Sequence, residues 1–198
     1  MVKAGSTNVK KIIILGVLCA LIVGAFALLA NRRPKNIDDG VKMSVVEQLL
    51  SRNLNTSYPP TPKEVVKLYS EYTRCFYGET YTEDELDELA LKSRELLDYE
   101  LVQNQTDEQF LQSLKQDIER YKAEGRSISS YSIASAADVE YDSFDGYEWA
   151  RLSCYYSMKI GTTIVPVHEK YLLRKDFEGH WRIVGWDLVS EDDQGDQG

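Results

Sequence analysis

Hydrophobic side chains recur every three or four positions between residues 61 and 125, which is the spacing of amphipathic helices. Three stretches of this region each begin with a threonine that is followed three residues later by Glu or Gln. This pattern is a capping box, in which the threonine oxygen accepts a hydrogen bond from a backbone N–H at the start of the helix. It predicts three helices, over residues 61–78, 82–97 and 106–125. A shorter helix is predicted at 41–52, where Ser44 and Glu47 form the same box.

From Tyr131 onward, hydrophobic and polar residues alternate, as they do along a strand with one buried face. Short turns that contain glycine separate four such stretches, at 131–141, 150–158, 163–176 and 180–186. Short turns join antiparallel neighbours, so we predict a four-stranded antiparallel meander. Helices first and strands last indicate an α+β domain with the helices on one face of the sheet. The face of the second strand turned toward the helices should carry Ala150, Leu152, Cys154, Tyr156 and Met158.

Residues 12–30 form a run of nineteen residues without a charged or polar side chain, preceded by lysines and followed by arginines. As a helix this run spans about 28 Å, close to the ~30 Å hydrocarbon thickness of a bilayer. We predict an uncleaved transmembrane anchor in contact with membrane lipid. Two alternatives stay open. One is a cleaved signal peptide, although cleavage sites lie beyond the apolar core. The other is a lipoprotein attached at Cys19, although Leu18 is larger than the residue that precedes such a cysteine.

Gly16, Ala20 and Gly24 lie four residues apart, on one face of the predicted anchor. Small residues at this spacing let two membrane helices pack closely, so homo-oligomerisation through the anchor is open. Basic residues are balanced on the two sides of the anchor and give no orientation. Because a single early anchor before a large domain most often leaves the short tail in the cytosol, we predict a single-pass membrane protein whose C-terminal domain is extracytoplasmic.

The chain is therefore divided into a short tail, the anchor, a juxtamembrane linker with a short helix, an α+β domain and an acidic disordered tail. The segments are 1–11, 12–30, 31–60, 61–189 and 190–198. All 32 acidic residues but only 20 of the 23 basic residues lie beyond Ala30, which leaves twelve net negative charges on residues 31–198. Such a surface repels phosphate, so nucleic acid is not an expected partner.

Cys75 and Cys154 are the two cysteines beyond the predicted anchor. They suit either one disulfide in an oxidising compartment or two buried thiols that pack as small apolar residues. Their spacing is not that of a metal site, and the chain has no glycine-rich phosphate loop. We therefore predict neither a metal nor a cofactor.

The three capped helices, the long-stranded meander and the closing segment GHWRIVGWDL at residues 179–188 resemble the nuclear transport factor two-like superfamily. The resemblance covers about residues 61–189 and implies a cone-shaped fold, in which a bent sheet wraps around a long helix. The anchor followed by this domain also resembles uncharacterised exported proteins of Gram-positive bacteria. The superfamily includes steroid isomerases, dehydratases and non-catalytic binding or assembly modules, so the fold does not determine the function.

Few residues suit catalysis. His168 and Glu169 are adjacent in a strand and point to opposite faces, so they cannot form a dyad. The inward set of the second strand has no carboxylate to act as a proton shuttle. Tyr156 and His168 are the pocket candidates, and we assign no catalytic residue. We expect a non-catalytic domain that binds a partner or assembles with another envelope protein. The alternative is a small-molecule binder or enzyme that uses the interior of the cone. A deep pocket lined by His168 with a facing carboxylate or tyrosine would favour this alternative, whereas a cone filled by Leu, Met and Tyr would favour assembly.

Overall fold

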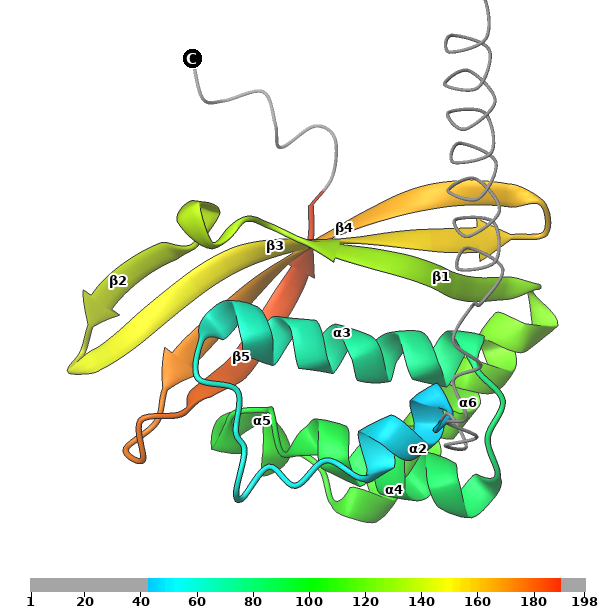
Figure 1. Ribbon diagram of the computed structural model, residues 1–198, viewed down its shortest axis with the longest axis horizontal. Helices are drawn as coiled ribbons and strands as arrows, with labels where there is room; N and C mark the ends of the chain where they lie inside the picture. The colour runs from blue at the N-terminus through cyan, green and yellow to red at the C-terminus, as the bar shows by residue number, and fades with distance from the viewer. Residues whose placement is uncertain (1–42, 190–198) are drawn as a thin grey trace, which may run out of the picture. The chain divides into compact units, whose positions relative to one another are not determined.

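Five helices and an antiparallel sheet of five strands make up residues 43–189, the part of the chain that the computed structural model describes (Figure 1). This arrangement confirms the predicted α+β class. The predicted anchor, with Gly16, Ala20 and Gly24, lies outside the described residues, as do the predicted tails 1–11 and 190–198. Within 43–189, no helix is both long enough and apolar enough to cross a membrane.

Each helix of the described residues begins at a capping residue, and for all of them except α5 this residue was expected from the sequence. They are α2 (Val45–Leu50), α3 (Pro62–Gly78), α4 (Glu83–Arg94), α5 (Tyr99–Val102) and α6 (Asp107–Ala123). At the start of α4, the backbone N–H of Glu85 donates to the Thr82 hydroxyl at 3.3 Å, and the Glu85 carboxylate accepts from the Thr82 N–H at 2.7 Å. The boxes at α2 and α6 are complete in the same way, and Thr61 caps α3.

Helix α4 ends three residues before the predicted position because Leu96 and Leu97 leave the helix and lie beside strand β5 (Trp181–Leu188). The N–H of Ile183 donates to the carbonyl oxygen of Leu96 at 2.9 Å. The N–H of Asp98 donates to the carbonyl oxygen of Ile183 at 2.8 Å. The side chain of Asp98 then caps α5, a helix that the sequence pattern does not predict.

The sheet has the order β1-β3-β4-β5, with β2 also paired to β3. Its other strands are β1 (Arg126–Ile133), β2 (Glu140–Phe144), β3 (Tyr147–Ile160) and β4 (Thr163–Lys175). The prediction of four strands, with a single strand over 131–141, is wrong. A 3₁₀ turn at Ala136–Asp138 divides this segment between β1 and β2, and both pair with β3. The turn forms because the Ser135 hydroxyl accepts a hydrogen bond from the N–H of Ala137 at 3.3 Å.

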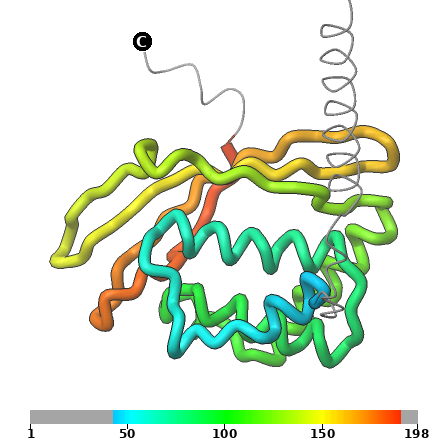
Figure 2. Tube along the Cα trace, viewed as in Figure 1, coloured from blue at the N-terminus to red at the C-terminus, as the bar shows by residue number. Residues whose placement is uncertain are grey.

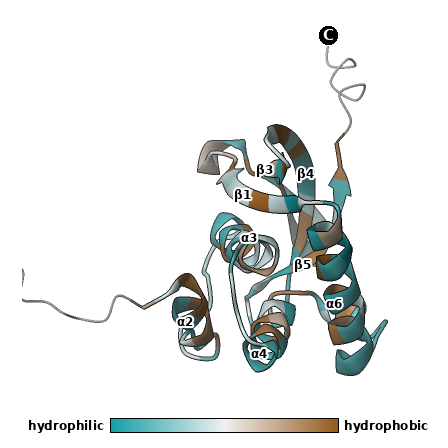
Figure 3. Ribbon diagram, turned by 90° about the vertical axis from the view of Figure 1, so that its right-hand side faces the viewer, coloured by the Kyte–Doolittle hydropathy of each residue, from teal (hydrophilic) through white to brown (hydrophobic). Residues whose placement is uncertain are grey.

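The sheet arches over α3, with β1, β3 and β4 above the helix and β5 beside it, while α4 lies on the opposite side of α3 from β1 (Figure 3). Strands β3 and β4 run together as a long hairpin over this helix (Figure 2). Ala150, Leu152, Cys154 and Tyr156 are buried on the predicted inward face of β3. Because α3 is enclosed by the sheet and the other helices, its apolar face supplies much of the core.

Candidate ligand-binding cavity

A cavity of about 500 Å³ lies between α3, α6 and the inner face of the sheet. The sheet contributes side chains from β1, β3, β4 and β5 to its wall, so residues far apart in the sequence meet there. Most of the lining is apolar or aromatic. The lining includes the aromatic and charged side chains Tyr69, Tyr77, Asp117, Tyr121, Arg126, Tyr156, Glu169, Tyr171 and Trp186.

Aromatic rings form two groups on this wall. Tyr69, Tyr171 and Trp186 are mutual neighbours, with ring centroids 5.5 Å apart for Tyr69 and Trp186 and 5.8 Å apart for Tyr171 and Trp186. Tyr77 of α3 contacts Tyr121 of α6, with 4.5 Å between the ring centroids. Rings at these separations attract one another through dispersion and their quadrupoles, and they present faces that can receive an apolar or cationic ligand.

A chain of hydrogen bonds leads from the cavity into the core. The Tyr171 hydroxyl donates to Glu169 Oε2 at 2.7 Å and lies 2.9 Å from the Tyr156 hydroxyl. The Tyr156 hydroxyl is 2.8 Å from Ser70 Oγ, which is 3.4 Å from Cys154 Sγ. Each hydroxyl carries one proton, so the donation by Tyr171 fixes the direction of the chain. Tyr156 donates to Tyr171, and Ser70 donates to Tyr156.

Glu169 is the carboxylate at the end of this chain. It faces the cavity because it lies opposite Cys154 of β3 in register, on the inward side of β4. Within 43–189, no lysine or arginine forms an ion pair with it. Burial raises the pKa of Glu169, and the hydrogen bond from Tyr171 opposes this shift. Burial also raises the pKa values of Tyr156 and Tyr171, so both hydroxyls keep their protons at neutral pH.

The other charged groups of the cavity wall have partners of opposite charge. Asp117 accepts a hydrogen bond from the Tyr77 hydroxyl at 2.6 Å and forms an ion pair with Arg120. Arg126 pairs with Glu124, with 2.8 Å between Nε and Oε2. The unbalanced charge on this wall is therefore the carboxylate of Glu169 when it is ionised.

A family model described as a domain of unknown function (DUF6715) matches residues 1–186. The chain belongs to this family. The match includes both the predicted anchor and nearly all of the described domain. A search of curated proteins finds no match to the chain.

Of the two pocket candidates from the sequence, Tyr156 lines the cavity of this DUF6715 member and His168 does not. His168 lies on the other face of the sheet, where its ring stacks on Tyr155 at 4.3 Å and its Nε2 is 2.8 Å from the Ser153 hydroxyl. Burial lowers the pKa of His168, and the charge of Lys170 lowers it further. The structure therefore separates the two candidates.

Cys75 and Cys154 are both buried, and both are free thiols in the structure. Burial raises the pKa of Cys75 to about 11 and also raises that of Cys154, which keeps both thiols protonated and unreactive near neutral pH. Cys154 contacts the hydrogen-bonded chain behind the cavity wall, whereas Cys75 packs in the core on α3.

Sequence reasoning missed Glu169 and Asp117. Asp117 lies three residues after Leu114 and four before Tyr121, which places it on the apolar face expected for α6. Glu169 lies two residues from both Val167 and Tyr171 and therefore on the same face of β4 as these residues. The helical spacing was thus available as a signal for Asp117, whereas β4 has apolar residues on both faces and gave no clear signal for Glu169.

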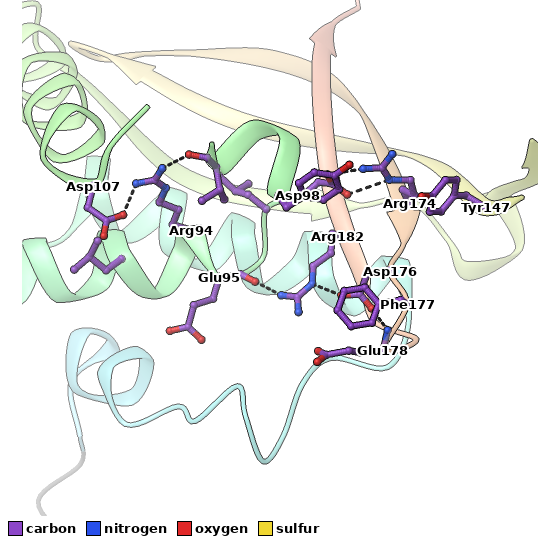
Figure 4. A pocket seen from close by; sticks show the side chains of 14 residues that line it. Arg94, Glu95, Asp98, Asp107, Tyr147, Arg174, Asp176, Phe177, Glu178 and Arg182 are labelled. Carbon is purple, nitrogen blue, oxygen red and sulfur yellow. Dashed lines mark hydrogen bonds and ion pairs between the residues drawn. The ribbon is translucent and has the colours of Figure 1, made fainter. Parts of the chain in front are cut away.

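A second hollow, of about 660 Å³, lies among the end of α4, α5 and the turn between β4 and β5 (Figure 4). Its three arginines already have acidic partners. Arg174 binds Asp98 at 2.7 Å, Arg182 binds Asp176 at 2.8 Å, and Arg94 binds Asp107. Because these charges are satisfied within the domain, they do not offer a free site for an anion. The pair of Arg174 and Asp98 also joins the start of α5 to the sheet.

Asp176, Glu178 and His180 hold possible metal ligand atoms within 4.8 Å of one another on the same turn. The oxygens of Asp176 are already occupied. They accept hydrogen bonds from the backbone N–H groups of Glu178 at 3.0 Å and His180 at 2.8 Å, and from Arg182 at 2.8 Å. This group therefore stabilises the turn, and we assign no metal to it.

Proposed function

We propose that the domain binds a small molecule in the cavity between α3, α6 and the sheet, and that residues 12–30 hold it at a membrane. The observation that carries the proposal is Glu169, a carboxylate without a basic partner among the described residues, on the wall of a largely aromatic cavity. The volume of about 500 Å³ lies in the range of about 300–1,000 Å³ that is typical of ligand pockets. A ligand would supply the contacts that the wall leaves open.

The contrast with the rest of the domain supports this proposal. The fully buried charged side chains are matched by groups of opposite charge, as Asp98 and Arg174 are, whereas Glu169 is partly buried and has no ion-pair partner within 43–189. Burying a charged group without a partner is costly, so a core used only for stability would not be expected to retain one. Polar groups that converge in an apolar pocket are a common mark of ligand recognition.

We also propose membership of the nuclear transport factor two-like superfamily. The curved antiparallel sheet around α3 and the cavity at its inner face agree with the cone-shaped fold expected from the sequence. This assignment favours the use of the interior as a binding site, which is the alternative that the sequence left open. It does not name a ligand, because the superfamily fold supports many functions.

The proposed location is extracytoplasmic, with the chain crossing the membrane once. Fractionation should recover the full chain with membranes, and protease added outside intact cells should remove the domain. Deleting residues 12–30 should release the domain and abolish its cellular role. Full-length chain in the soluble fraction, or a mature N-terminus beyond Ala27, would contradict the anchor.

Ligand binding is tested with the full chain in nanodiscs of zwitterionic lipid, with empty nanodiscs as the blank. Equilibrium dialysis against small naphthalene derivatives measures uptake without a reporter group. Leu114→Trp should block the cavity from α6, whereas Gln112→Trp places the same ring on the exposed side of that helix. We expect uptake by the wild type and Gln112→Trp and a loss in Leu114→Trp. Equal uptake by all three chains would refute binding in this cavity.

A second candidate function is docking of another envelope protein on strand β2. All five residues of β2 are exposed, and the exposed fraction is 71% for Phe144 and 62% for Tyr141. Within 43–189, this strand pairs only with β3. An open edge accepts a strand from a partner. A photo-crosslinking residue at Asp142 in intact cells should capture such a partner, and one at Glu119 should not. Capture of a second copy would assign the edge to homo-oligomerisation.

A further inference from the structure

We infer that the ligand of this cavity carries a positively charged amine on an apolar or aromatic body. This inference depends on the proposed function, because it names the chemical class of molecule that the cavity binds. The two oxygens of Glu169 differ in their hydrogen bonding. Oε2 accepts the hydrogen bond from Tyr171 at 2.7 Å, and Oε1 has no hydrogen-bond partner within 43–189. An ammonium group donates in several directions and fits this open acceptor.

The charges on the wall favour a cation over an anion. Asp117 is balanced by Arg120 and Arg126 by Glu124, so the ionised Glu169 leaves an excess of negative charge. An anionic ligand would be repelled by this charge and would find no free basic group on the cavity wall. A neutral ligand could accept a hydrogen bond from Glu169 only if Glu169 were protonated.

The hydrogen-bonded chain supports the ionised form as the one that receives the ligand. The Tyr171 hydroxyl donates to Glu169, the Tyr156 hydroxyl donates to Tyr171, and the Ser70 hydroxyl donates to Tyr156. Such a chain stabilises a carboxylate acceptor. A cationic ligand would add a second favourable interaction at the other oxygen.

The aromatic wall next to Glu169 fits the rest of the molecule. Tyr69, Tyr171 and Trp186 form one contiguous group, in which Tyr69 and Tyr171 have ring centroids 6.1 Å apart. Aromatic faces attract an ammonium group and pack well against an apolar body. The carboxylate and the rings together therefore select an amine attached to an apolar group.

Three ligands of similar size test the inference with the full chain in nanodiscs. They are 1-naphthylmethylamine, 1-naphthalenemethanol and 1-naphthoate, which differ in charge and share the aromatic body. Equilibrium dialysis at neutral pH should show the amine bound about tenfold more tightly than the alcohol, a ratio expected of one charge-assisted hydrogen bond, with the carboxylate weakest.

Glu169→Gln should lower the affinity for the amine by about tenfold and leave that for the alcohol within about twofold, because only the charge is removed. Glu119→Gln, which removes an exposed charge on α6, should change neither affinity. Equal affinities for the amine and the alcohol, or tightest binding of the carboxylate, would overturn the inferred ligand class while retaining a binding cavity. No uptake of any of the three would overturn both this inference and the proposed function.

Discussion

Tyr171 donates its hydroxyl proton to the carboxylate of Glu169, two residues earlier on the same strand, across 2.7 Å. The two side chains share the inward face of β4 because alternate residues of a strand point the same way. Tyr171 thereby holds one carboxylate oxygen in place and connects it to Tyr156. The hydrogen bond between Tyr171 and Glu169 therefore joins the cavity wall to the hydrogen-bonded chain in the core.

Tyr171→Phe removes one hydroxyl, which leaves Glu169 without its hydrogen-bond donor and the Tyr156 hydroxyl without the acceptor of its proton, while the bond between Tyr156 and Ser70 remains. We expect it to lower the free energy of unfolding by about 1–3 kcal/mol, the usual cost of unsatisfied buried polar groups. Denaturant titration of the full chain, followed by tryptophan fluorescence, measures the change. Tyr155→Phe alters a half-exposed ring on the other face of the sheet and should stay within about 0.5 kcal/mol of the wild type. Equal effects of the two substitutions would contradict the role of this hydrogen bond.

The raised pKa of Glu169 predicts how stability depends on pH. Burial favours the protonated form, so the folded state binds this proton more tightly than the unfolded chain does. The resulting stabilisation is fully present below the unfolded-state pKa and is lost as the pH rises through the folded-state pKa. The Glu169→Gln variant has no proton to release at this position, so its stability does not fall in this way as the pH rises. The variant should therefore gain stability relative to the wild type across the window that begins at the ordinary glutamate pKa and ends at the raised value.

Unfolding of the wild type and Glu169→Gln in parallel, at closely spaced pH values, measures this difference. Asp117 also faces the cavity, and Asp117→Asn provides the control for a carboxylate that already has partners. A saturating cationic ligand should oppose the loss in the wild type, because it stabilises the ionised form. A constant difference between the wild type and Glu169→Gln at all pH values would contradict the pKa assigned to Glu169.

Gly78 marks the point where the end of α3 approaches strand β1. A Cβ atom at this position would lie 2.8 Å from the carbonyl oxygen of Ile128, which belongs to the backbone and has little room to move. Gly78→Ala should therefore destabilise the domain by about 1–3 kcal/mol, despite the better helix propensity of alanine. Gly185→Ala is the matched control, because a Cβ there meets no atom within 4 Å. A smaller loss for Gly78→Ala than for Gly185→Ala would show that the helix end can move.

The sequence predicted the features that depend on local chemistry. The caps at Thr82 and Thr106 need only neighbouring residues, and the inward face of β3 follows from strict alternation. The end of α4 was missed because Leu96 gains a partner, Ile183, that is far away in the sequence. The division of β1 from β2 was missed for a similar reason, since both strands depend on pairing with β3.

The candidate site was predicted only in part because β4 does not have a clear apolar face. Ile164 and Pro166 are exposed although they are apolar, and Glu169 faces inward although it is charged. Alternation alone therefore gave no reason to choose Glu169 over His168. Tyr156 was identified because it lies on β3, where hydrophobic and polar residues do alternate. The ionic partners of Asp117 and Arg126 required the three-dimensional structure.

Asp98 and Arg174 form an ion pair in which both side chains are almost fully buried, with 2.7 Å between Nη2 and Oδ1. The guanidinium also lies over the rings of Tyr147 and Trp149, at 4.8 and 5.5 Å from their centroids. Asp98→Ala leaves this charge without its buried partner and should lower the free energy of unfolding by about 3–5 kcal/mol. Urea titration of Asp98→Ala, Arg174→Ala and the double variant measures the coupling, and the double variant should lose less than the two single losses combined. If Asp98→Ala cost no more than the exposed substitution Glu119→Ala, the pair would not be what fixes α5 to the sheet.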